Sequence, residues 1–149
     1  MHAPLNPDFE ARVRASFARQ AAMTLIGARM VTVEPGRCVI ELPSREDLTQ
    51  QHGFVHGGVV GMIADSAGGY AGFTLMPADA SVLTVEYKIN MLAPAAGELL
   101  VATGEVLKPG RTLSIVRAEV VALQGQKRTR VAAMQQTLMV MHGVADEKI

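Results

Sequence analysis

Residues 57–78 read GGVVGMIADSAGGYAGFTLMPA, and Asp65 is the only charged side chain among them. The segment is longer than an ordinary strand and poor in β-branched residues, so we predict a helix over residues 57–75. A buried carboxylate in so apolar a segment must be neutralised, hydrogen-bonded or functional. Asp65 is therefore the first candidate for catalysis. The structural alternative is an acid satisfied by neighbouring hydroxyl or backbone groups.

Helical spacing gathers most of the glycines onto the same face as Asp65, because residues three and four apart lie above one another on a helix. Missing side chains on this face would let another backbone or a ligand come close. We therefore predict that the acid lies in a groove of small residues. The predicted face comprises Gly58, Gly61, Met62, Asp65, Gly68, Gly69 and Gly72.

The tripeptide His56-Gly57-Gly58 stands at the start of the predicted helix. A helix N-terminus presents free backbone N–H groups and the positive end of the helix dipole, which together suit a negatively charged oxygen. We therefore predict an oxyanion site at Gly57 or Gly58, two turns before the acid. A histidine in this position is also a common capping or packing residue, so both interpretations of His56 stay open.

The rest of the chain predicts a short helix and six strands. Asn6-Pro7 is typical of a helix start, and apolar residues then recur at helical spacing, which predicts an amphipathic helix over residues 7–22. The loop 43–55 precedes the central helix, and short glycine-containing turns separate the later apolar runs, as expected for antiparallel neighbours. Apolar and polar residues alternate over 84–91, which predicts a strand with one packed face. The predicted strands cover residues 28–34, 37–42, 84–91, 98–107, 112–123 and 128–141.

A sheet of this size buries one nearly apolar helix best by curling around it. At 149 residues the chain fits a single domain with a sizeable core. We therefore predict one α+β domain over residues 1–149. Its core is expected at about residues 25–141, preceded by the short N-terminal helix.

The composition of the chain limits which partners the protein is expected to bind and which compartment it is expected to occupy. Fourteen Lys and Arg balance fourteen Asp and Glu, which argues against nucleic-acid binding. The N-terminus lacks an apolar leader, and Asp65 and six glycines interrupt the least polar run, so we predict neither a signal peptide nor a membrane span. The single cysteine, Cys38, falls in a predicted strand and is expected to be a buried structural thiol. These features favour a reducing, cytoplasmic compartment.

Three segments carry a resemblance to a known family: HGFVHGGVVGMIADSAGGYA (52–71), SVLTVEYKINMLAPA (81–95) and KPGRT (108–112). They resemble the hotdog-fold acyl-CoA thioesterases of the phenylacetate-degradation (PaaI-like) group, over about residues 25–141. The resemblance implies a six-stranded antiparallel sheet wrapped around one long helix. It also implies homodimers that pair their sheets edge to edge, and dimers that stack into homotetramers.

The resemblance also assigns expected site residues. The family's catalytic carboxylate falls on Asp65, and its HGG turn, in which a glycine N–H polarises the thioester carbonyl, falls on His56, Gly57 and Gly58. An upstream amide matches Gln50, and a hydroxyl on the following strand matches Thr84. The expected function is hydrolysis of an aryl- or medium-chain acyl-CoA. Asp65 would act as general base or as nucleophile, and both routes stay open.

Helix geometry supports a shared site independently of the resemblance. Gly57 and Asp65 are eight residues apart, or about 12 Å along one helix. An oxyanion donor and an attacking group must both lie within about 3 Å of one reacting carbonyl, so one helix cannot supply both. Two antiparallel helices related by a twofold axis could bring Asp65 of one subunit to Gly57 of the other. We therefore predict two equivalent active sites per dimer.

Coenzyme A enters only as part of the substrate, so no cofactor is expected. Arg111, Arg128 and Arg130 are candidates to contact the phosphates of its tail, although a solvated strand edge is the plainer interpretation. His52 and His56 could be read as metal ligands, but no third ligand with suitable spacing appears, and no metal is predicted. Two other functions remain, a non-catalytic acyl-CoA-binding hotdog protein and a hotdog hydratase or dehydratase.

Overall fold

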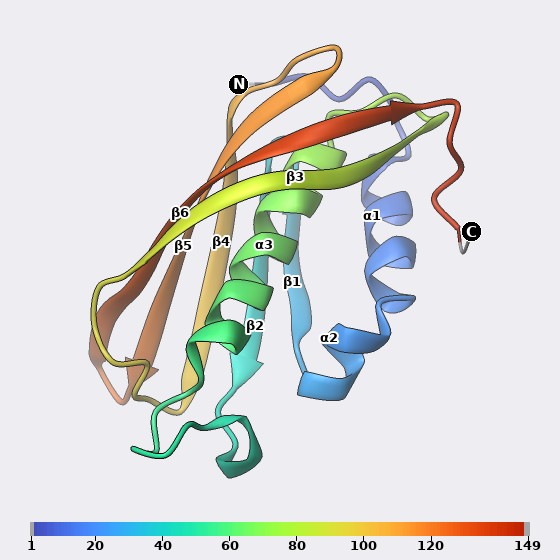
Figure 1. Ribbon diagram of the computed structural model, residues 1–149. Coiled ribbons are helices and arrows are strands. Elements are labelled where there is room, and N and C mark those ends of the chain that lie inside the picture. The colour runs from blue at the N-terminus through green and yellow to red at the C-terminus, as the bar shows by residue number, and fades with distance from the viewer. Residues whose placement is uncertain (1, 148–149) are drawn as a thin grey trace.

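The glycine-rich segment forms helix α3 (Gly57–Phe73), which lies in the concave face of a curved sheet (Figure 1). The computed structural model describes residues 2–147. Thr74 ends the helix, close to the predicted end. The other elements are α1 (Phe9–Ala18), α2 (Ala21–Ile26), β1 (Arg29–Glu34), β2 (Arg37–Pro43), the 3₁₀ helix η1 (Glu46–Leu48), β3 (Ala80–Met91), β4 (Leu99–Lys108), β5 (Leu113–Gln124) and β6 (Lys127–His142).

The sheet has six strands in the order β1-β2-β4-β5-β6-β3, and every neighbouring pair is antiparallel. Helix α3 connects β2 to β3 in the chain. In the sheet, β3 lies at the edge opposite β1. This arrangement confirms the predicted α+β hotdog fold, with the sheet wrapped around the central helix. Within residues 2–147, no helix is long and apolar enough to cross a membrane.

Helix α3 packs closely against the sheet because a glycine on β4 lets the two backbones meet. A Cβ at Gly104 would lie 2.3 Å from the backbone oxygen of Ala67, so only glycine fits there. The buried face of the helix, with Val60, Ile63 and Ala64, joins inward side chains of the strands in the main core. Most of α3 is therefore fixed by the sheet, which positions any functional group that the helix carries.

The N-terminal helix differs from the prediction of one helix over residues 7–22. Helix α1 begins at Phe9, and the Asn6 side chain accepts a hydrogen bond from the N–H of Asp8 instead of capping the helix itself. The chain then takes an extended conformation at Gln20 before α2 begins. After this break, α2 buries Met23 and Ile26 in the core.

Strand β3 also differs from expectation. It is longer than predicted, and its register with β6 shifts between Thr84 and Glu86. The expected packed face is only partly covered within the chain: Ile89 packs against the main core, but Val85, Tyr87 and Met91 remain 45%, 46% and 51% exposed. Since β3 is an edge strand, its outer side has no neighbouring strand among residues 2–147. The chain thus leaves a long apolar edge open.

Helix α1 is tied to the end of α3 by one arginine. The Arg12 guanidinium donates to the backbone oxygens of Phe73 and Met76, both at 3.0 Å, and its carbon lies 4.1 Å from the centre of the Phe73 ring. These carbonyls stand at the C-terminus of α3, where a positive charge is favoured by the helix dipole. Arg12 therefore anchors α1 onto the central helix.

We expect Arg12→Met to lower the free energy of unfolding by about 2 kcal/mol, because it leaves several carbonyls without a charged donor. Arg14→Met is the matched control on the same helix. It removes an exposed ion pair with Glu10 and a long, exposed hydrogen bond (3.4 Å) to the backbone oxygen of Met30, and should change stability by less than about 1 kcal/mol. Urea unfolding followed by circular dichroism, at matched protein concentration, measures both. Equal effects of the two substitutions would contradict the anchoring role.

Candidate active site

The Asp65 carboxylate is held by two side chains from the neighbouring strands. The Thr84 hydroxyl of β3 donates to Asp65 Oδ1 at 2.8 Å, and the Gln136 amide of β6 donates to the same oxygen at 2.9 Å. The amide nitrogen also lies 3.3 Å from Thr84 Oγ1. Asp65 Oδ2 accepts no hydrogen bond from any residue of 2–147. One carboxylate oxygen is therefore fixed while the other is available for chemistry.

Asp65 borders a cavity of about 750 Å³ between α1, α3, β3 and the C-terminal segment. Within it, the hydroxyl groups of Ser16 and Tyr70 lie 3.1 Å apart. Burial raises the pKa of the Tyr70 phenol, so this group stays protonated at neutral pH and can hydrogen-bond. We call this the Asp65 cavity. Its lining residues are Ser16, Arg19, Gln20, Asp65, Ser66, Gly69, Tyr70, Val82, Leu83, Thr84, Asp146 and Glu147.

The N-terminus of α3 offers one free amide. His56 is the N-cap residue, and its Nδ1 accepts the N–H of Gly58 at 2.9 Å. The N–H groups of Val59 and Val60 both donate to the backbone oxygen of His56. Among residues 2–147, the N–H of Gly57 has no acceptor. His56 therefore caps the helix, and Gly57 carries the unengaged donor of this turn.

Gly57 borders a second cavity, of about 440 Å³, at the other end of the helix from Tyr70. Gln50 contributes its side chain here, and its Oε1 accepts the N–H of His52. We call this the Gly57 cavity. It is lined by Gln50, Phe54, Val55, Gly57, Val60, Met91, Leu92, Ala93, Pro94, Ala95 and Val131.

The predicted site residues thus fall into two separate groups. The structure brings Asp65 and Thr84 together in one cavity, and Gln50 and Gly57 together in the other. The two groups are about 12 Å apart along α3, as the sequence spacing requires. Within one chain, the acid and the free N–H cannot act on the same carbonyl.

The predicted glycine face is likewise divided. A Cβ at Gly61, Gly68 or Gly72 would point toward side chains of β3, β5 or β6. At Gly69, by contrast, a Cβ would meet nothing within 4 Å, and this residue borders the Asp65 cavity. Gly61, Gly68 and Gly72 therefore serve the packing of the helix against the strands, whereas Gly69 leaves open space beside Asp65.

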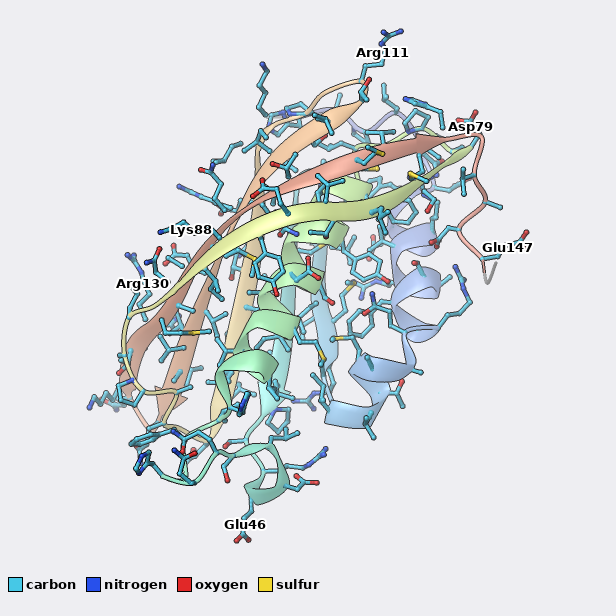
Figure 2. All side chains as sticks on the ribbon, viewed as in Figure 1. Glu46, Asp79, Lys88, Arg111, Arg130 and Glu147 are labelled. Atoms are coloured by element: carbon cyan, nitrogen blue, oxygen red, sulfur yellow. The ribbon has the colours of Figure 1, made fainter. Side chains whose placement is uncertain are left out.

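The three predicted arginines do not form one cluster. Arg111 lies beyond the end of β4, and Arg130 lies near the opposite end of the sheet (Figure 2). Arg128 is close to Arg130 on β6, where Arg130 forms an ion pair with Glu119 at 2.6 Å. The structure therefore does not bring the three together at one phosphate-binding site. The Gly57 cavity adjoins a smaller cavity that includes Lys127, at the Arg128 and Arg130 end.

Sequence reasoning missed Gln136, which is fully buried. One signal could have found it. Side chains on β6 alternate between the two faces of the sheet, and Gln136 occupies an inward position between Met134 and Leu138, where every other inward residue is apolar. A lone amide in such a series predicts a buried polar partner. Its partner could not be named without the strand register.

The structure also shows whether Cys38 suits a nucleophile and whether His52 and His56 suit metal ligands. Burial raises the pKa of the Cys38 thiol to about 12, so Cys38 is protonated at neutral pH and suits the predicted structural role rather than that of a nucleophile. His52 lies in the exposed loop before α3, whereas His56 is engaged as the helix cap. Among residues 2–147, no three His, Cys, Asp or Glu side chains converge as metal ligands would.

Comparison with known proteins identifies the family. The sequence model of the Thioesterase superfamily matches residues 52–129. The crystal structure of a thioesterase family protein from Silicibacter pomeroyi is 47% identical, with a TM-score of 0.89 over 91% of this chain and 99% of that one. The 1,4-dihydroxy-2-naphthoyl-CoA hydrolase of Listeria monocytogenes is 31% identical over 60% of this chain and 73% of its own length.

A more distant structure agrees in fold. The E. coli PaaI protein of the phenylacetic acid degradation operon has a TM-score of 0.82 at 22% identity, over 94% of this chain and 98% of that one. The chain therefore belongs to the thioesterase superfamily, and the predictions of a PaaI-like hotdog fold and of a thioester hydrolase are confirmed.

Proposed function

We propose that the protein hydrolyses the thioester of an aryl- or medium-chain acyl-CoA to the free acid and coenzyme A. The observation that carries this proposal is the Asp65 carboxylate, which has one oxygen fixed by Thr84 and Gln136 and the other free beside a cavity of about 750 Å³. A cavity of this size suits an acyl group of moderate length. The name of the Listeria relative, which specifies an aromatic acyl-CoA, supports the same substrate class.

The proposed active site is completed by a second subunit. Asp65 would work with the N–H of the partner subunit's Gly57, because the two groups are too far apart in one chain. The uncovered edge strand β3 supports a homodimer, since its exposed Val85, Tyr87 and Met91 would be buried by pairing with the same strand of another copy. Each dimer would hold two equivalent sites. Exposed apolar side chains at Leu107 and Leu113 offer a further surface on which dimers could stack into tetramers.

The proposed chemistry follows from these positions. The thioester carbonyl would accept the N–H of the partner subunit's Gly57, which stabilises the negative charge that develops on oxygen. Asp65 would remove a proton from a water as that water attacks the carbonyl carbon. The tetrahedral intermediate would then break its C–S bond, and the proton held by Asp65 would leave with the thiolate as free coenzyme A. The alternative is direct attack by Asp65 to form an anhydride that water then hydrolyses.

The remaining predicted residues have supporting roles in this proposal. His56 would hold the turn so that the Gly57 N–H stays free, and Gln50 would line the approach to it. Arg128 and Arg130 lie at the end of the sheet near the Gly57 cavity, so they are better placed than Arg111 to meet the phosphates of coenzyme A. Water and these side chains suffice for the reaction, so we propose that no cofactor takes part.

Thiol release from phenylacetyl, benzoyl, short, medium and long acyl-CoA esters tests the function. We expect cleavage by the native chain and a loss of about 10² to 10⁴-fold in kcat for Asp65→Asn, because the amide cannot accept the proton. Asp79→Asn, an exposed change just beyond α3, is the matched control and should retain activity. Binding without cleavage would instead indicate an acyl-CoA-binding protein. If the protein consumes an unsaturated or β-hydroxy acyl-CoA ester but releases no free thiol, it would instead be a hydratase or dehydratase.

Gly57→Pro tests the oxyanion donor, because proline removes one N–H and is well tolerated at the first position of a helix. His56 already has the extended backbone that a residue before proline needs, with φ −58° and ψ 136°. We expect kcat to fall about 10² to 10³-fold.

Gly57→Ala is the matched control for this substitution. It keeps the N–H, and its Cβ would meet only the end of the Met91 side chain, at 3.4 Å. Its kcat should stay close to the native value. A similar loss in both variants would show that the space at Gly57, and not its N–H, matters for activity.

A further inference from the structure

The amide of Gln136 is buried against α3 and meets the catalytic carboxylate from the sheet side. Its Nε2 lies 2.9 Å from Asp65 Oδ1, 3.3 Å from Thr84 Oγ1 and 3.4 Å from the backbone oxygen of Asp65. The two Asp65 oxygens can only accept hydrogen bonds when the acid is ionised. The nitrogen end of the amide must therefore face Asp65, since the reverse orientation would place two acceptors against each other.

The other end of the same amide is left without a partner. Gln136 Oε1 is buried and accepts no hydrogen bond from residues 2–147. An unpaired buried oxygen is unfavourable for folding, and such groups often mark a functional position. An apolar residue would fill this inward position of β6 without that cost, as Met134 and Leu138 do on either side.

A glycine on the helix makes room for this amide. Gly68 lies one turn after Asp65, and a Cβ there would come within 1.7 Å of Gln136 Oε1. Any side chain at position 68 would therefore push the amide away from Asp65. The glycine on α3 and the glutamine on β6 form a matched pair, although they are distant in sequence.

We propose that Gln136 is a positioning residue for catalysis, which with Thr84 fixes Oδ1 of Asp65 so that Oδ2 faces the substrate. The inference rests on the proposed thioesterase function and goes beyond it, because Gln136 itself is buried and touches no substrate. A charged acceptor with two donors on one oxygen keeps a single orientation. Without the amide, the carboxylate would retain only the Thr84 hydroxyl and could turn within the cavity.

Gln136→Met tests this role, because methionine fills a similar volume but has no N–H to donate. Gln135→Met is the matched control, since the adjacent glutamine is exposed on the opposite side of β6. On the best ester for the native chain, we expect Gln136→Met to lower kcat roughly 10 to 100-fold, because a misplaced reacting group slows the chemical step. Its KM should stay within about threefold of native, and its melting temperature should not fall below that of the control.

Two kinetic outcomes would overturn the proposal. One is an unchanged kcat in a folded Gln136→Met. The other is a rise in KM with kcat intact, which would mean that Gln136 shapes the acyl cavity instead of orienting the acid.

A second measurement needs no substrate, and so separates this inference from the proposed function. In nitrogen-15 NMR spectra, the side-chain amide of Gln136 is identified by its absence from Gln136→Met. We expect one of its protons to resonate downfield in the native chain and to move upfield in Asp65→Ala, where the carboxylate acceptor is missing. An amide proton whose chemical shift is unchanged in Asp65→Ala would overturn the positioning role, even if Gln136→Met folds poorly. A shifted signal in a chain that cleaves no thioester would refute the proposed function and leave the positioning of Asp65 intact.

Discussion

A single carboxylate in the middle of an almost wholly apolar helix sets the conditions that the surrounding structure must meet. Asp65 is half-buried, so donors have to reach it from other elements, and they come from β3 and β6. For the sheet to bring Gln136 that close, the helix must lack a side chain at the position that faces this amide. Gly68 and Gly72 of α3, together with Gly104 of β4, provide this close approach between helix and sheet. The glycine at position 68 thus follows from the contact between Gln136 and Asp65.

The second constraint is the length of helix between Asp65 and Gly57, the proposed oxyanion donor. The free N–H of Gly57 and the carboxylate of Asp65 belong to one rigid helix and border different cavities, so neither can move to the other. In the proposed dimer, each subunit contributes half of each site. Catalysis would then require assembly. One dimer interface would cover the exposed apolar edge of β3 and would also complete both sites.

Much of the architecture could be predicted from local patterns. The central helix, the antiparallel strands and the turns between them follow from periodicity and glycine placement, and Asp65 stands out by charge alone. The N-terminal helix was predicted as one piece because its break at Gln20 depends on burying Met23 and Ile26, which is a tertiary effect. Gln136 could not be paired with Asp65, since their contact spans 71 residues and depends on the register of β6. The separation of Arg111 from Arg130 likewise follows from strand order.

In the proposed dimer, each active site takes its acid from one subunit and its oxyanion donor from the other. Mixed dimers of Asp65→Asn and Gly57→Pro subunits, isolated by a different affinity tag on each, test it most directly. Each parent dimer would be inactive, but a mixed dimer would contain one site with both native groups. We expect about half of the native activity per mixed dimer, because one of two equivalent sites is intact. Mixed dimers as inactive as their parents would place both groups in the same subunit and contradict the shared site.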